Sequence, residues 1–305
     1  MHRFRILHAT TALLAFAFVA ISAAPPAHAA GTDDYLQELG TWQHQREENL
    51  RSRDGWLTLV GLFLLSQGDN SFGSAADNKL VFPAKAPAHA GVLHVAGDQV
   101  QIEAAADAGI TTEDQPVTRM TLRPDSDENP TVLSMGTFTF FVIARGEQLF
   151  VRLKDSESPA LAEFRGIDRF PASPTWRIEA RFEPYNPPHK ITVPNVLGTS
   201  FDETSPGAVV FELNGKTYRL DPVGEPDQSL FLIFGDQTNG PVTYGGGRFL
   251  SADPPGPDGK VILDFNRAYN PPCAFTPYAT CPLPPRQNKL AVRIEAGEKK
   301  YGRGH

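Results

Sequence analysis

The chain has 305 residues, with 28 Lys and Arg against 35 Asp and Glu, 26 Gly, 27 Pro and 2 Cys. Its net charge of −7 argues against a nucleic-acid backbone as partner, because such binding relies on Lys and Arg that displace counterions. The many glycines and prolines indicate short ordered segments between frequent turns, and two cysteines exclude a four-cysteine zinc site.

The first 29 residues have the pattern of a cleavable secretory signal peptide. Two arginines precede an apolar run over residues 12–24, and small residues flank His28. This is the pattern that export requires, and the apolar run is too short to span a bilayer. We therefore expect a periplasmic or secreted protein that begins after Ala29. It should have no transmembrane helix, and no lipid anchor because no Cys precedes Cys273.

Residues 30–55 contain the one segment with convincing helical spacing. Tyr35, Leu39 and Trp42 recur on one face, with Asp residues near the positive end of the helix and arginines near its negative end. We predict an N-terminal amphipathic helix over residues 33–53 that flanks a sheet.

Short β-forming runs separated by Gly, Pro, Asp and Asn follow the helix, as is typical of sandwiches and barrels. In the first half the predicted strands cover residues 56–65, 92–95, 100–104, 117–122, 137–144 and 148–153. In the second half they cover residues 175–182, 208–213, 216–220, 229–234, 242–250, 261–266 and 290–296. Asn214-Gly215 predicts a type I′ hairpin turn, because both residues adopt positive φ readily. The chain is thus predicted to be all-β apart from the N-terminal helix.

The first β-rich stretch, residues 56–155, resembles a forkhead-associated (FHA) domain. The resemblance rests on Gly73-Ser74, DNKLV at residues 77–81, APAHA at 86–90 and LSMG at 133–136. It implies an FHA-like β-sandwich over about a third of the chain.

The phosphate-binding residues of the FHA family are not matched. Such domains bind phosphothreonine through an Arg after the first Gly and a Ser-Arg pair before the His, and here these places hold Ser74, Ala86 and Pro87. Without those donors, the desolvation of a dianionic phosphate is not offset. The resemblance therefore implies the fold and not the ligand, and phosphothreonine binding is not expected. His89 is expected to be a buried, hydrogen-bonded structural residue.

A connector over residues 156–173 is predicted to lead into a second β-rich module over residues 174–300. This module contains the run DFNRAYNPPCAFTPYATCPLPP, which begins at Asp264. Together with DGWLTLVGL at 54–62, PNVLG at 194–198 and YGGGRF at 244–249, the run looks like a bacterial family catalogued only as a domain of unknown function. The resemblance covers almost the whole mature chain and implies no chemistry.

Cys273 and Cys281 are predicted to form a disulfide that closes a short loop. Paired thiols become disulfides in the oxidising compartment that the leader predicts. A redox pair or a thiolate nucleophile is the alternative, although redox motifs usually hold two residues between their cysteines rather than seven.

Five polar residues of the second module are the candidate ligand-binding residues. Asp264 and Asn266 should share one face at a strand end, while Arg267 points away unless a bulge intervenes. Arg248 follows three glycines that could cradle an anion, and Asp236 lies on the turn before that strand. Each has a structural alternative: the first three could tie the proline-rich loop down, Arg248 could follow a bulged hairpin, and Asp236 could cap its turn.

These patterns leave several functions open. We expect a non-catalytic ligand-binding or interaction module of the cell envelope whose five candidate residues form one polar mouth for an unknown small molecule or envelope protein. One alternative is a cofactor-free, hydrolase-like enzyme with Asp264 as acid or base and Arg267 or Arg248 as the oxyanion partner. Another is a purely structural envelope protein. No motif for a triad, a metal or a nucleotide is present, so we predict no metal and no cofactor.

Overall fold

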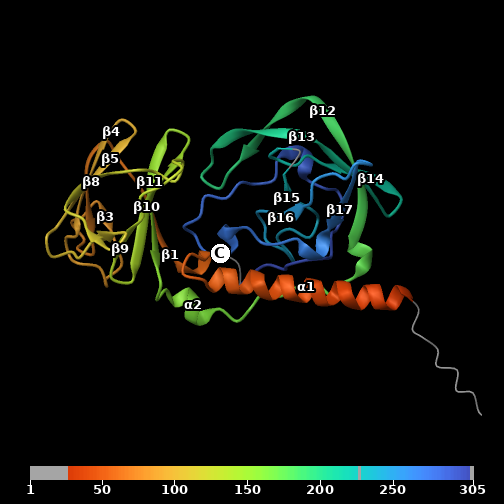
Figure 1. Cartoon of the computed structure of the whole chain (residues 1–305), viewed down its shortest axis with the longest axis horizontal. Coiled ribbons are helices and arrows are strands. Elements are labelled where there is room, and N and C mark those ends of the chain that lie inside the picture. Colours follow the sequence, from red (N-terminus) through yellow and green to blue (C-terminus); the bar gives the residue numbers. More distant parts are fainter. Residues whose placement is uncertain (1–26, 226–227, 303–305) are drawn as a thin grey trace, which may run out of the picture.

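The computed structural model describes residues 27–225 and 228–302, so the predicted signal peptide lies almost wholly outside the described residues. In this part of the chain no helix is both long and apolar enough to cross a membrane. The described residues form two β-rich lobes, with a long helix along one edge (Figure 1).

The long helix α1 spans Ala27–Arg51, so it begins six residues earlier than predicted and runs across the expected cleavage point. Its buried side chains include Leu39 and Leu50, and Tyr35 and Trp42 are half-buried on the same face. Since these residues have the helical spacing seen in the sequence, the predicted N-terminal helix is confirmed.

The N-terminal lobe is a sandwich of two sheets. One sheet has the order β1-β11-β10-β9-β6-β7, with bounds Leu59–Leu64, Gln148–Asp155, Phe138–Arg145, Leu133–Met135, Thr111–Thr112 and Gln115–Pro116. The other has the order β3-β2-β4-β5-β8, with bounds Leu80–Val81, Gly68–Gly73, Gly91–Ala96, Gln99–Ala104 and Arg119–Leu122. Alternating apolar residues from both sheets, among them Phe72, Ile102 and Phe140, form one core between them.

The C-terminal lobe packs a four-stranded antiparallel sheet against a hairpin. The sheet order is β14-β13-β12-β17, with bounds Lys216–Leu220, Ser200–Leu213, Arg177–Pro194 and Lys260–Asp264. The hairpin pairs β15 (Leu230–Phe234) with β16 (Arg248–Ala252). Asn214 and Gly215 join β13 to β14 with φ of 53° and 72°, so the predicted hairpin turn is confirmed. The all-β prediction with one N-terminal helix is confirmed as well.

Short helical segments join these strands. They are η1 (Trp56–Thr58), α2 (Pro159–Glu163), η2 (Pro174–Trp176), η3 (Phe265–Arg267), η4 (Pro272–Ala274) and η5 (Arg286–Asn288). Cys273, in η4, and Cys281 form the predicted disulfide, with their Cα atoms 6.1 Å apart.

Two predicted strands of the second half are wrong in part or whole. Residues 242–247 form turns, because the Thr243 hydroxyl pairs with Thr238 at 2.8 Å and accepts from Asn239 at 3.0 Å. Residues 290–296 are irregular and alternate between buried and exposed positions, because their backbone partners are partly side chains. The N–H of Ile294, for example, is 3.3 Å from a carboxylate oxygen of Asp236, which accepts from it.

The histidine prediction in the sandwich is also wrong. The His89 side chain is 63% exposed, and its nearest charged partner is the Asp77 carboxylate at 3.9 Å. The buried amide in this region is Asn78, whose Nδ2 donates to the carbonyls of Ala75 and Ala88 at 3.0 and 2.8 Å. Asn78 therefore ties the loop, as an amide can satisfy two buried carbonyls at once where a histidine in its usual neutral form cannot.

Candidate functional site

The five predicted site residues lie in two separate clusters. Asp236 and Arg248 form one, and Asp264, Asn266 and Arg267 form the other. No hydrogen bond or ion pair within the described residues links the two clusters directly. The structure therefore does not bring these residues together as one polar mouth.

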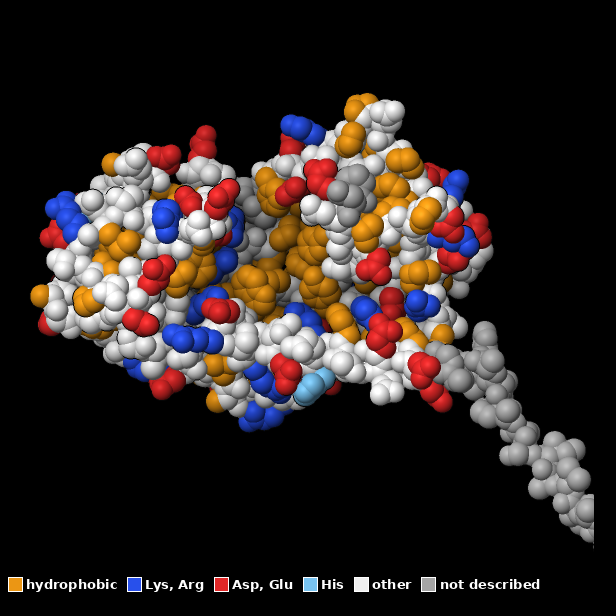
Figure 2. Space-filling view, in the orientation of Figure 1, with side chains coloured by type: hydrophobic (Ala, Val, Ile, Leu, Met, Phe, Trp, Pro, Cys, Tyr) orange, Lys and Arg blue, Asp and Glu red, His pale blue; other side chains and the backbone are white. Residues whose placement is uncertain are grey.

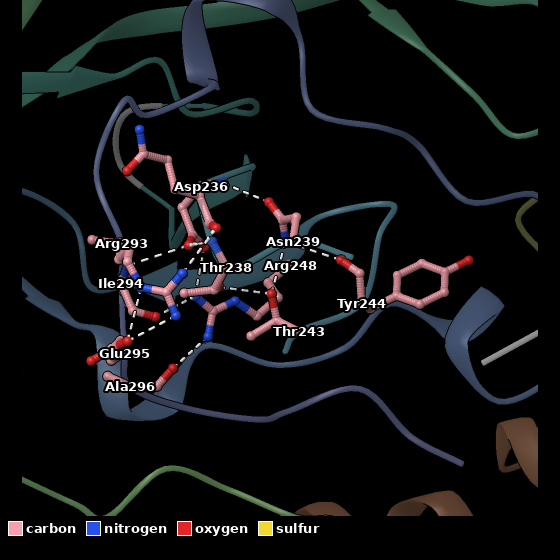
Figure 3. A network of polar contacts seen from close by, with 11 residues as sticks. Asp236, Thr238, Asn239, Thr243, Tyr244, Arg248, Arg293, Ile294, Glu295 and Ala296 are labelled. Carbon is pink, nitrogen blue, oxygen red and sulfur yellow. Dashed lines mark hydrogen bonds and ion pairs between the residues drawn. The ribbon is translucent and has the colours of Figure 1, made fainter. Parts of the chain in front are cut away.

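The first cluster belongs to a network of polar contacts (Figure 3) and is buried. The side chains of Arg248 and Asp236 are both 0% exposed, and Arg248 Nη2 donates to Asp236 Oδ2 at 2.7 Å and to the carbonyl of Ile294 at 2.9 Å. Arg248 Nη1 donates to the carbonyl of Ala296. Burial lowers the pKa of Arg248 while Asp236 raises it. This pair joins β16 to the C-terminal segment and has no surface to offer a ligand.

The second cluster attaches helix α1 to the end of β17. The Tyr35 hydroxyl lies 2.9 and 3.0 Å from the two carboxylate oxygens of Asp264, and Asn266 Nδ2 donates to Tyr35 Oη at 2.8 Å. Burial raises the pKa of Tyr35, and the hydrogen bond to Asp264 raises it further. The Asp264 carboxylate is therefore engaged by protein donors, as expected of a structural tie.

Arg267 belongs to this cluster, contrary to the expectation that it points away. Residues 265–267 turn into a 3₁₀ helix, which brings Arg267 Nε to 3.4 Å from Asp264 Oδ2. Arg267 also pairs with Glu38 of α1. These contacts anchor helix α1, whereas the sequence suggested that they would anchor the proline-rich loop.

A cavity with a volume of about 830 Å³ lies away from both clusters, between the two lobes. We call it the inter-lobe pocket. Figure 2 shows it as a hollow with a hydrophobic floor and with Lys or Arg atoms on the side of the N-terminal lobe. Its volume lies within the range of small-molecule sites, which are mostly apolar clefts with a few polar groups.

Five segments that are distant in sequence form the inter-lobe pocket. From the N-terminal lobe come Trp56 of η1 and the β10–β11 hairpin; from the C-terminal lobe come the β12–β13 turn, the β15–β16 hairpin and the disulfide loop. The main lining side chains are Trp56, Arg145, Arg152, Asn195, Thr199, Phe201, Phe231, Phe249, Pro272, Thr280 and Pro282. The disulfide therefore fixes part of a pocket wall.

Arg152 is the unusual residue of this pocket. It is only 6% exposed, and no carboxylate among the described residues forms an ion pair with it. Its Nε has no hydrogen-bond partner, and its Nη2 is 3.5 Å from the Thr280 hydroxyl. The guanidinium lies 5.5 Å from the ring centroid of Trp56. Burial lowers its pKa to about 10, with a further lowering by Arg145 and an opposing effect of Asp125.

Arg145 lines the same wall but is neutralised. Its Nη2 donates to Asp125 Oδ2 at 2.8 Å and its Nη1 to Asp125 Oδ1 at 3.2 Å, which is the two-pronged geometry of an Arg-carboxylate pair. Its Nε donates to Thr280 Oγ1 at 3.2 Å. The Thr280 oxygen thus accepts from two arginines, and its own proton remains available as a donor.

The sequence analysis missed these pocket residues, although one signal was present. In β11 the run LFVRL places Arg152 among four apolar residues, where a buried strand predicts another apolar side chain. A charge inside such a run indicates either a buried ion pair or a functional group. Its partner Thr280 is 128 residues away, so no local pattern could have joined them.

The C-terminal lobe matches the model of a known family. The family model described as "Protein of unknown function (DUF1684)" matches residues 162–299. The chain belongs to the DUF1684 family through this half. The solution structure of an uncharacterized protein from Haloarcula marismortui is 30% identical and covers 45% of this chain and 78% of its own, with a TM-score of 0.38. None of the curated proteins matches the chain.

Solved FHA domains are also similar to part of the chain. The FhaA FHA domain complexed with the intracellular domain of Rv3910 is 15% identical and covers 30% of this chain and 97% of its own, with a TM-score of 0.22. A structure from an analysis of phosphothreonine-dependent FHA domain interactions is 17% identical, at 32% and 96% coverage and the same TM-score. The DUF1684 region supplies the apolar floor of the inter-lobe pocket, whereas Arg145 and Arg152 lie outside that region.

Proposed function

We propose that this DUF1684 protein is an exported, non-catalytic binding protein that holds a small, largely apolar molecule in the inter-lobe pocket. The observation that carries the proposal is a cavity of about 830 Å³ whose inner surface is mostly apolar, with aromatic side chains on the side of the C-terminal lobe and polar groups from both lobes. Export rests on the leader pattern in residues 1–29.

The lining chemistry favours binding over catalysis. A hydrolase needs a nucleophile or an acid and a base within reach of one another. The lining residues include no His and no Asp, and Cys281 is in the disulfide. The one lining carboxylate, Glu147, is exposed at the β10–β11 turn. Asp264, the acid or base of the enzyme alternative, is engaged by Tyr35 and Asn266 outside the pocket.

The test uses the neutral fluorescent probe N-phenyl-1-naphthylamine. The protein should bind it with one-to-one stoichiometry, and Phe201→Ser should weaken binding about tenfold, because the loss of one buried aromatic contact is worth about 1–2 kcal/mol. Phe201 lines the pocket and is 40% exposed.

Ile262→Ser is the matched control. Ile262 is 38% exposed on β17 and does not line the pocket, so this variant should bind the probe as the unmodified protein does. The proposal fails if the unmodified protein does not bind the probe, or if both variants weaken binding equally.

A further inference from the structure

The structure contains two buried arginines with opposite surroundings. Arg248 has a carboxylate and two carbonyls around its guanidinium. Arg152, at 6% exposure, has no carboxylate partner and only one long contact to a hydroxyl, whereas the Nε atoms of both arginines are unpartnered. Because a buried charge without a partner is strongly unfavourable, a site that keeps one is arranged for an anion that arrives from outside.

The donors around Arg152 are suited to a small anionic head group. The guanidinium presents several N–H donors in one plane, which matches the two oxygens of a carboxylate. Thr280 adds a hydroxyl whose oxygen already accepts from Arg145 and Arg152. Its proton can therefore point at the same ligand oxygen.

Apart from the exposed Glu147, the charges at this wall sum to one positive charge. Asp125 neutralises Arg145, which leaves Arg152 as the unpaired cation of the wall. Glu147, the other charged lining residue, is exposed at the β10–β11 turn, where water screens it. A monoanion balances this wall, whereas a dianion leaves a net negative charge in a desolvated site.

The phenylalanines and prolines on the C-terminal side of the pocket form an apolar surface suited to a hydrocarbon, beside the polar residues Asn195, Thr199 and Ser200. Phe201, Phe231 and Phe249 line the C-terminal side, and Phe231 and Phe249 are in edge-to-face contact at 5.0 Å between centroids. Pro272 and Pro282 continue this apolar surface beside the disulfide. These groups bury methylene groups and offer no hydrogen bonds to a polar chain.

We infer that the inter-lobe pocket binds an amphiphilic monoanion of the carboxylate type, with its head group on Arg152 and Thr280 and its hydrocarbon chain against the phenylalanines. This inference rests on the proposed function and adds the ligand class. The charged head selects the ligand, and burial of the chain supplies the remaining affinity.

The test compares decanoate with decanol, which have chains of equal length, by displacement of N-phenyl-1-naphthylamine at pH 8. The protein should bind decanoate about tenfold or more tightly than decanol, because a hydrogen bond to a charged group is the stronger kind. In Arg152→Met the ratio of the two affinities should fall to about one, since the cation that would pair with the carboxylate of decanoate is gone. Lys154→Met is the matched control and should keep the preference, since Lys154 lies two residues further along β11 and does not line the pocket.

The outcomes separate the two proposals. If the probe binds but decanoate and decanol compete equally in the unmodified protein, the anion inference is overturned and the proposed function stands. If the probe itself does not bind, the proposed function fails. Decyl phosphate, mostly dianionic at pH 8, should compete less well than decanoate; if it competes better, the monoanion assignment is overturned.

Discussion

At the scale of single residues, burial alone does not distinguish structural from functional arginines in this protein. Arg248 is 0% exposed and Arg152 is 6% exposed. Burial lowers the pKa of both guanidinium groups, but only Arg248 has a carboxylate in contact to counter this effect. The partners therefore separate the two roles: Arg248 holds the fold together, and Arg152 keeps an unsatisfied charge at the wall of a pocket.

This contrast predicts opposite effects of one substitution at the two positions. Arg152→Met should raise the free energy of unfolding by about 1 kcal/mol, as often happens where a functional group is removed. Arg248→Met should lower it by about 3 kcal/mol or more, because the charge of Asp236 is then left buried without its partner. Urea unfolding at pH 7 measures both.

The same experiment can contradict the assignment of Arg152. A loss of stability in Arg152→Met comparable to that in Arg248→Met would mean that Arg152 is a structural anchor acting through Thr280. The ligand inference would then lose its central observation.

At the scale of elements, helix α1 is held on the C-terminal lobe largely by polar side chains. Beyond Tyr35 and Glu38, Arg46 donates to the buried Glu298 at 3.1 Å and to the carbonyl of Asn270 at 2.9 Å, and Glu47 pairs with Arg169 at 2.8 Å. Few apolar residues of α1 are buried, so these contacts determine where the helix lies. The stability contributed by the attachment of this helix is therefore expected to depend on pH.

The Tyr35 hydroxyl determines in which direction pH changes the stability of this attachment. Its pKa is raised in the folded state, so its contribution is complete below the ordinary tyrosine value of about 10 and is lost as pH rises above that value. At pH 7, Tyr35→Phe should lower the free energy of unfolding by about 2 kcal/mol, the typical value of a hydrogen bond to a charged group.

The difference between the two proteins should shrink at pH values above about 10, where tyrosine ionises in the unfolded chain. Urea titrations of both proteins across this pH range test the prediction. The difference between the two series cancels the ionisation of the groups that both proteins share. A difference that stays constant or grows with pH contradicts the assigned role of Tyr35.

The strands and the cluster of Asp264 also show which features can be predicted from local sequence patterns. Strands such as β10 and β14 follow from local alternation and turn residues, and the structure places them close to where the sequence does. The sequence predicts the long strands β12 and β13 only in part, because residues 183–190 are mostly exposed and carry no alternation, and their pairing is interrupted between Pro184 and His189. The cluster of Asp264 was found from its position at a strand end, but its partner Tyr35 is 229 residues away.

At the scale of the whole molecule, the inter-lobe pocket exists only because the two lobes lie side by side. Each lobe has its own core, and the two cores share no residues. The cation at the pocket wall comes from β11 of one lobe, and the aromatic floor comes from β13, β15 and β16 of the other. A sequence pattern reports one element at a time, so neither half could reveal the pocket by itself.

This division predicts how a ligand stabilises the molecule. A ligand that binds only the folded state slows local opening wherever it makes contact. Decanoate should therefore slow amide hydrogen exchange in three segments at once: the β10–β11 turn over residues 144–148, the β12–β13 turn over residues 195–200 and the disulfide loop over residues 273–281. The exposed β6–β7 turn at residues 113–114, which opens locally and does not line the pocket, serves as the internal control and should exchange at an unchanged rate. Hydrogen-exchange mass spectrometry with and without decanoate measures these exchange rates. If the protein does not prefer decanoate over decanol, decanol is used as the ligand instead. Protection confined to one lobe would place the ligand on that lobe alone, and the pocket would then not be the binding site.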